Sequence, residues 1–228
     1  MTGLSKGLAG AAGAASGTGA LVFGIYKLSS SEELKTISSL LDSKKRKLIK
    51  SNDGSEESWK SAWQKYRSDF NSSDKNPFSL TWSKGTSSVS SENATQAFME
   101  ACEVQGSKKV KDIESEDYQL FFKYCTRNTL MSDLVVENPS RKALVKVANE
   151  TEDSKWVAVW EDYKKVNKDK ANQADHWKLS DWPNKSSENK VPVSFMTQCE
   201  TELKREYFDV EGDDYKKVIS WCTESVSP

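Results

Sequence analysis

AFMEACE at residues 97–103 and SFMTQCE at residues 194–200 share the pattern Phe-Met-x-x-Cys-Glu and lie 97 positions apart in a chain of 228 residues. The same shift aligns further aromatic, acidic and cysteine residues. The aligned pairs are Trp59 and Trp156, Trp63 and Trp160, Tyr66 and Tyr163, Asp117 and Asp214, Tyr118 and Tyr215, Cys125 and Cys222, and Thr126 and Thr223. Because self-similarity at a fixed period indicates a repeated structural unit, we predict two tandem modules, at residues 36–128 and 129–225.

Two stretches between the aligned blocks are predicted to be long loops. Residues 70–90 and 168–191 are rich in Ser, Asn, Lys and Pro, and the register of the repeat slips there by a few positions. Phe78, Leu80 and Trp82 then correspond to Trp177, Leu179 and Trp182. Insertions and turn-forming residues favour loops, which we expect these aromatic residues to fix in place.

Hydrophobic periodicity predicts a mainly α-helical fold. Trp59, Trp63 and Tyr66 stand at i, i+4 and i+7, which places three rings on one face of a helix, and the second module repeats the spacing. Phe98 and Cys102 share a face in the same way, as do Tyr118 and Cys125. We also expect an earlier helix in each module, at residues 33–49 and 141–147. Sustained alternation of apolar and polar residues, which would indicate strands, is lacking.

The four cysteines predict one disulfide in each module. Cys102 and Cys125 are 23 positions apart, and so are Cys199 and Cys222. Each pair lies on the apolar faces of two consecutive predicted helices, which antiparallel packing can bring to the Cα separation of ~5.5 Å that a disulfide needs. Buried free thiols are the alternative. A metal site is not expected, because the chain has no C-x-x-C motif and its single histidine, His176, corresponds to Pro77 in the first module.

Residues 1–30 are predicted to form an N-terminal membrane anchor. From Gly7 to Tyr26 the chain has no charged residue, and Lys6 and Lys27 bracket this run, whose length suits a helix that crosses a bilayer. A cleaved signal peptide and a soluble tail are the alternatives. Gly13 and Gly17 form a G-x-x-x-G pair through which two anchors could self-associate.

The predicted location is the cell membrane, with the bulk of the chain extracellular. Disulfides persist in oxidising compartments and therefore favour export. The basic run of residues 44–47 argues the other way, since positive charge close to an anchor favours a cytoplasmic side. We give the duplicated cysteines more weight, because the basic run has no equal in the second module.

Composition and motifs exclude several classes of function. The formal net charge of −1 offers no basic surface for nucleic acid. Nucleophilic catalysis needs a base such as histidine, and His176 is not repeated. The repeated acids Asp117/Asp214 and Glu103/Glu200 are the remaining candidates for an acid–base pair, but Asp117 and Asp214 suit the start of the last helix, where negative charge is stabilised by the helix dipole. We therefore expect no enzyme, no catalytic residues and no cofactor.

The motifs taken together resemble a known group of proteins. They are the Ala/Gly-rich N-terminal segment, the W-x-x-x-W-x-x-Y blocks at 59–66 and 156–163, the Ser-Glu-Asn triplets at 91–93 and 187–189, F-M-x-x-C, and the closing aromatic-Cys-Thr at 124–126 and 221–223. Over essentially its whole length, the chain is similar to the paralogous families of uncharacterised surface proteins of haemotropic mycoplasmas. The resemblance implies a surface-displayed, variable protein with a role in attachment to red blood cells or in immune evasion. It implies no functional residues.

We expect a membrane-anchored surface protein that acts in host-cell contact or as a variable antigen, with the membrane and host-cell surface components as partners. One alternative is a surface protein that binds a small molecule or nutrient in Trp-rich clefts, and another is a scaffold without a ligand. The tryptophans discriminate among these. Burial of Trp59, Trp63, Trp156 and Trp160 would weaken the small-molecule alternative, whereas an open groove at Trp82 or Trp182 would favour it.

Overall fold

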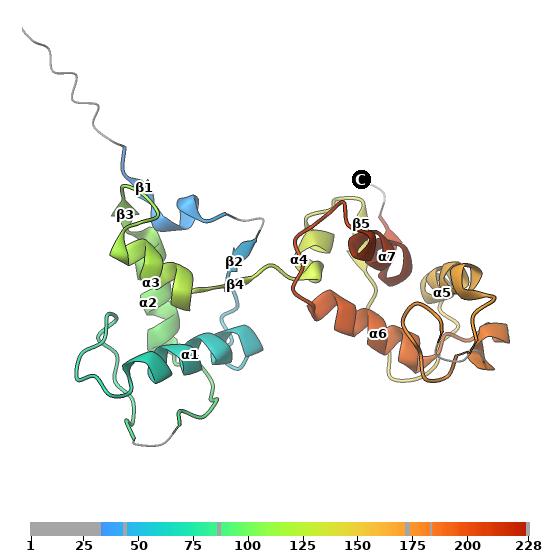
Figure 1. The fold of residues 1–228 in the computed structure, drawn as a ribbon, viewed down its shortest axis with the longest axis horizontal. Coiled ribbons are helices and arrows are strands. Elements are labelled where there is room, and N and C mark those ends of the chain that lie inside the picture. The colour runs from blue at the N-terminus through green and yellow to red at the C-terminus, as the bar shows by residue number, and fades with distance from the viewer. Residues whose placement is uncertain (1–32, 43–44, 86–87, 172–173, 183, 227–228) are drawn as a thin grey trace, which may run out of the picture. The chain divides into compact units, whose positions relative to one another are not determined.

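A computed structural model describes residues 33–42, 45–85, 88–171, 174–182 and 184–226 (Figure 1). Within these ranges the chain is mainly helical, as predicted, with seven α-helices. Short strands, which the sequence did not predict, are also present. None of the helices in these ranges is both long and apolar enough to cross a bilayer. The predicted anchor, with its uncharged run at 7–26 and the Gly13/Gly17 pair, lies outside the described residues.

The first half of the described chain builds three longer helices and two small sheets. The elements are β1 (Lys35–Thr36), the 3-10 helix η1 (Ile37–Leu40), β2 (Arg46–Leu48), α1 (Glu57–Phe70), α2 (Gln96–Ser107), β3 (Lys109–Val110), α3 (Glu116–Tyr124) and β4 (Thr126–Asn128). Helix α3 packs against both α1 and α2 (Figure 1). Strand β1 pairs antiparallel with β3, and β2 pairs antiparallel with β4, so the two strands that precede α1 pair with the two that follow α2.

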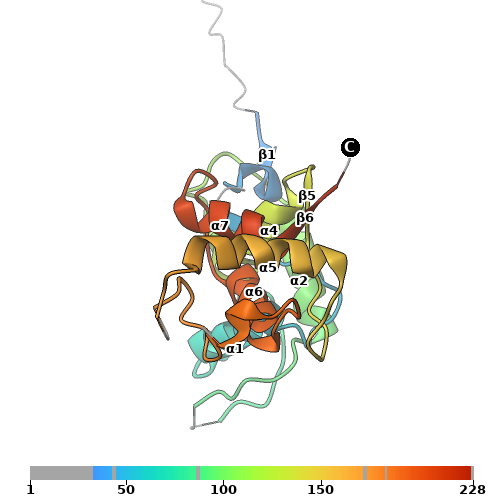
Figure 2. The same ribbon diagram turned by 90° about the vertical axis from the view of Figure 1, so that its right-hand side faces the viewer.

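The second half repeats this plan with one sheet. Its elements are α4 (Met131–Val136), β5 (Arg141–Ala143), α5 (Ser154–Asn167), the 3-10 helix η2 (Asn184–Ser187), α6 (Val193–Lys204), α7 (Asp213–Cys222) and β6 (Thr223–Ser225). Helix α7 packs against both α5 and α6 (Figure 2). Strand β5 pairs antiparallel with β6, as β2 does with β4.

Each half has its own hydrophobic core. The first core contains Ile37, Trp59, Trp63, Tyr66, Phe98, Met99, Cys102, Phe121, Tyr124 and Cys125 among its buried residues. The second core contains Met131, Trp156, Trp160, Tyr163, Phe195, Met196, Cys199, Val218, Trp221 and Cys222. Aromatic rings dominate both cores, because the sequence has few aliphatic residues and each ring removes ~150–250 Å² from water.

Side-chain caps explain where several helices begin. The Thr95 hydroxyl accepts a hydrogen bond from the Phe98 N–H at the start of α2, and Ser115 does the same for Tyr118 at the start of α3. The Asp153 carboxylate accepts from Lys155 and Trp156 at the start of α5. Each cap satisfies a backbone donor that the first helical turn leaves unpaired.

The helices predicted at 33–49 and 141–147 are wrong. The first range holds β1, η1 and β2, and the second holds β5. Both ranges pair with strands about 80 residues further along the chain, with Leu48 opposite Thr126 and Ala143 opposite Thr223. Strands of two or three residues are too short to show alternation, so the leucines in the first range suggested a helix instead.

Candidate functional site

The four cysteines form two disulfides, as predicted. The first disulfide joins Cys102 to Cys125, and the second joins Cys199 to Cys222, with Cα atoms 5.4 Å apart in each. In both, the first cysteine lies within a helix, α2 or α6, and the second lies at the end of the next, α3 or α7. The disulfides therefore tie equivalent helices together in the two cores.

The tryptophans proposed as binding residues are mostly core residues. Trp63 and Trp160 are 1% and 0% exposed, and Trp59 and Trp156 are also buried. Trp182 is buried and packs edge-on against Trp160, as the partly buried Trp82 does against Trp63. The indole N–H of Trp59 donates to the Ser51 carbonyl at 2.6 Å, and that of Trp156 donates to the Val145 carbonyl at 3.1 Å. The idea of open Trp-rich clefts consequently loses its main support.

A buried tyrosine in each core fixes the loop that follows its helix. The Tyr66 hydroxyl donates to Asn76 Oδ1 at 2.5 Å and accepts from the Phe78 N–H at 2.9 Å. Tyr163 repeats this arrangement with Asp175 and the Trp177 N–H. Burial raises the pKa of Tyr66 to about 12, and burial followed by the hydrogen bond to Asp175 raises the pKa of Tyr163. Both hydroxyls therefore remain donors near neutral pH, and the predicted register of the loops is confirmed.

An arginine in each half was not predicted from the sequence. Arg46 donates through Nε and Nη2 to Thr126 Oγ1, at 3.0 and 2.8 Å, and through Nη2 to the Phe122 carbonyl at 3.1 Å. Arg141 donates to Thr223 Oγ1 at 2.9 Å and to the Ile219 carbonyl. These arginines are 95 positions apart, so an alignment of the two copies at a shift of 97 does not place them opposite each other. Arg46 thus joins β2 to the end of α3.

The repeated aspartates lie in the first turns of α3 and α7, as predicted. Asp117 accepts hydrogen bonds from Lys108 Nζ at 2.7 Å and from Gln105 Nε2 at 2.8 Å, which lower the pKa of this carboxyl. Asp214 accepts from Arg205 at 2.9 Å, at the position equivalent to Lys108. In both halves this carboxylate links the helix to the end of the preceding one.

His176 lies beside the Trp221 ring, with ring centroids 5.3 Å apart. Partial burial, followed by the charge of Lys217, lowers the pKa of this histidine. Over the described ranges, no three side chains of the His, Cys, Asp or Glu type are placed so that they could hold a metal ion. His176 therefore has the environment of a histidine packed against an aromatic core.

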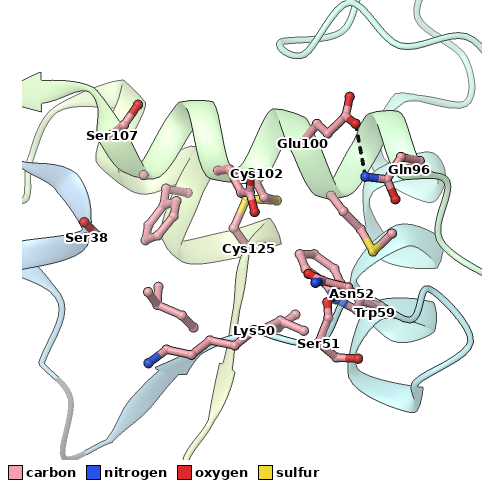
Figure 3. Close-up of a pocket in the computed structure, with 16 residues that line it drawn as sticks. Ser38, Lys50, Ser51, Asn52, Trp59, Gln96, Glu100, Cys102, Ser107 and Cys125 are labelled. Atoms are coloured by element: carbon pink, nitrogen blue, oxygen red, sulfur yellow. Dashed lines mark hydrogen bonds between the residues drawn. A yellow bond between two sulfur atoms is a disulfide. The ribbon is translucent and has the colours of Figure 1, made fainter.

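A cavity of about 360 Å³ opens beside the first disulfide, between α2 and residues 48–52 (Figure 3). Figure 3 shows the Cys102–Cys125 bond between α2 on one side and Lys50 and Ser51 on the other. The apolar lining comes from Leu48, Ile49, Trp59, Met99, Phe121 and the disulfide. A mostly apolar cavity of this size, with a few polar groups, is typical of sites for small molecules.

The polar part of the lining includes three charged side chains, Lys50, Glu100 and Glu103. Glu100 accepts a hydrogen bond from Gln96 Nε2 at 3.0 Å, one turn earlier on α2. The Ser107 hydroxyl, at the end of the helix, donates to the Val104 carbonyl at 2.8 Å. These groups can orient a bound molecule.

The second core has a hollow at the equivalent place that does not reach its disulfide. The hollow has a similar volume, about 360 Å³, and its lining includes Leu144, Met196, Glu200 and Leu203. Leu203 stands at the position of Gly106, where an added Cβ atom would lie 2.7 Å from the Phe121 ring. Val218 replaces Phe121 in the second core. Gly106 and Phe121 thus line the first cavity, whereas Leu203 lines the second hollow at the position of Gly106.

Comparison with known proteins gave no match to a family model, a curated protein or a solved structure.

Proposed function

We propose that the chain is a membrane-anchored surface protein, in which two tandem disulfide-bonded helical modules, at 36–128 and 129–225, follow an anchor at 7–26. Its role is host-cell contact or display as a variable antigen, with the bulk of the chain extracellular. The observation that carries the proposal is the pair of equivalent disulfides, one in each core. Disulfides of this kind form and persist outside the cytosol.

The distribution of repeated and unrepeated residues supports the same role. The repeated residues are the aromatic and cysteine framework of the two cores. The unrepeated residues concentrate between α1 and α2 and between α5 and α6, where the described residues form mostly exposed loops. Loops on a rigid framework tolerate change, which suits a variable surface. The resemblance to surface proteins of haemotropic mycoplasmas supports this role further.

Location is tested by protease treatment of intact cells that display the chain. Trypsin has many sites after residue 30, because the chain has 33 lysines and arginines. We expect it to remove that region while a cytoplasmic marker enzyme stays intact. Complete protection of the chain would place it inside and contradict the proposal. Thiol labelling of the denatured chain gives a second readout, in which labelling of all four cysteines before reduction would contradict export.

The role is tested on the same cells by binding to red blood cells and to antibodies from infected hosts. The test variants replace only the exposed residues of 174–182 with Gly or Ser. Trp177 and Trp182 are kept, because both pack against the second core. We expect such variants to lose red-cell or antibody binding and to keep both disulfides. If the displayed chain binds neither, host-cell contact and antigen display are both excluded.

The cavity beside the first disulfide favours a second candidate, a surface protein that binds a small molecule. This candidate uses the space under α2, which Trp59 helps to line, instead of an open groove at Trp82 or Trp182. It is compatible with surface display and differs from the first candidate in its ligand, which is a small apolar molecule instead of a cell surface.

A further inference from the structure

The cavity under α2 offers a bound molecule an apolar environment that extends down to the core. The sulfur bridge, Met99 and Phe121 line it, and each is largely buried. Transfer of apolar surface from water into such a space is favourable, by roughly 25 cal/mol per Å². The part of a ligand that enters the cavity should therefore be hydrocarbon.

The two copies differ in how they neutralise one repeated carboxylate. Glu200 on α6 pairs with Lys204 Nζ at 2.9 Å and with Lys146 Nζ at 3.5 Å. Its equivalent on α2 is Glu103, and Ser107 stands where the second copy has Lys204. Among the described residues, Glu103 has no ion pair within 4 Å. The first copy thus keeps the carboxylate and lacks the lysine one turn later on the helix.

The end of α2 adds to the negative potential at the same rim. Glu103 and Ser107 belong to the last turns of this helix, which ends at Ser107. The carbonyl groups at a helix C-terminus carry a partial negative charge and favour cations. Glu100, one turn before Glu103, contributes a second carboxylate to the lining. Lys50 is the single cation of the lining and belongs to the wall opposite α2, so the rim along the helix is acidic (Figure 3).

We propose that this cavity binds small apolar molecules that carry a cationic amino group, with the hydrocarbon part against the first disulfide and the ammonium group beside Glu103. The ligand cation takes the place that Lys204 occupies beside Glu200 in the second copy. The inference rests on the second candidate function and does not depend on whether the chain contacts host cells.

A matched series of probes tests the proposal on the full-length chain. The probes are 4-phenylbutylamine, 4-phenylbutan-1-ol and 4-phenylbutyrate, which share a hydrocarbon part and differ in charge. Titration calorimetry and the NMR signal of the Met99 methyl group report binding. We expect the amine to bind with a dissociation constant on the order of 0.1–1 mM, and up to about fivefold more tightly than the alcohol, since a single partly exposed ion pair contributes up to about one kcal/mol.

Two variants locate the site. Glu103→Gln keeps the size of an exposed side chain, and it should weaken amine binding about fivefold while leaving the alcohol unchanged. The double change Gly106→Leu with Phe121→Val places a leucine side chain in the cavity beside the first disulfide, where it should fill the apolar end, so binding of both probes should be lost. Residual signal in this double variant measures partition of the probes into the predicted anchor or any lipid present.

The outcomes test the cationic ligand and the existence of a small-molecule site separately. Tighter binding of the amine that depends on Glu103 supports the proposal. Equal binding of the amine and the alcohol, or tightest binding of the carboxylate, overturns the cationic ligand but keeps a small-molecule site. The absence of cavity-dependent binding by all three probes overturns the site itself, and with it the second candidate function.

Discussion

The substitution Asp175→Asn should stabilise the protein, because it copies an arrangement that the other core already has. Asn76 in the first core accepts from Tyr66 and from the Leu80 N–H at 2.9 Å, and its Nδ2 donates to the Leu80 carbonyl at 2.8 Å. Asp175 makes the two equivalent bonds through Oδ2, to Tyr163 and to the Leu179 N–H, while Oδ1 is buried without a partner. An amide here should reach the Leu179 carbonyl in the same way.

The expected gain follows from the groups involved. A new hydrogen bond contributes about 0.5–1.5 kcal/mol, and removal of an unpaired buried oxygen relieves a penalty of about 1–3 kcal/mol. Against this, the bonds from Tyr163 and Leu179 lose their charge assistance, about 1 kcal/mol each. The balance is a stabilisation of about 1–2 kcal/mol.

Urea denaturation followed by tryptophan fluorescence measures the effect, with thermal unfolding as a second assay. A gain of this size corresponds to about 2–8 °C in a chain of this length. The reverse change, Asn76→Asp, is the matched control. It removes the bond to the Leu80 carbonyl and should cost about 1–3 kcal/mol.

The pair of variants makes the reasoning refutable. If Asp175→Asn lowers stability while Asn76→Asp leaves it unchanged, the two loops do not use equivalent hydrogen bonds. The prediction also fails if both changes shift the free energy of unfolding in the same direction, since the residues at 76 and 175 then do not occupy equivalent sites.

The two disulfides and one ion pair give three further expectations. Replacing both cysteines of either disulfide with serine should lower the free energy of unfolding by about 3 kcal/mol, equally for the two, because both close a separation of 23 residues; a loss below 1 kcal/mol in urea melts would refute this. Under native conditions a small phosphine should reduce the first disulfide before the second, because the first lines the cavity under α2, whereas the hollow of the second core does not reach the second; mass spectrometry of alkylated cysteines showing equal rates would contradict it. Burial acts to raise the pKa of Asp133, but hydrogen bonds from Arg127, at 2.6 and 2.9 Å, and from the Leu130 N–H lower it below that of the unfolded chain. The stability from this pair is then complete above about pH 4 and lost as the pH falls through the folded-state pKa, so Asp133→Asn should flatten the pH dependence of urea melts in that range.

The repeat made much of the framework predictable from the sequence. A helical spacing that occurs twice, as in Trp59–Tyr66 and Trp156–Tyr163, is stronger evidence for a helix than either copy alone. The same holds for the cysteines, whose equal spacing and place on apolar faces predicted the observed disulfides. The slipped register at Phe78 and Trp177 predicted which rings fix the loops.

The short strands and the cavity were beyond this kind of reasoning. Strand β2 is defined by pairing with β4, a contact between residues about 80 positions apart that leaves no local period. The cavity depends on how completely side chains fill the space under α2, and periodicity shows which residues face inward but not how well they pack. One signal was nevertheless present, because Gly106 aligns with Leu203 at the shift of 97. A glycine on the inner face of a helix in one copy, aligned with a large residue in the other copy, indicates that the two cores are packed differently.

The pairing of β2 with β4 and of β5 with β6 has a consequence for how such chains can lengthen or shorten. In each half a strand that precedes the first long helix pairs with the last strand, so the polypeptide leaves a core beside a segment from near its beginning. Removal or addition of one whole copy would then interrupt no strand pair and no disulfide within the copies that remain. The number of copies in a chain built on this plan is therefore not limited by strand pairs or disulfides between copies.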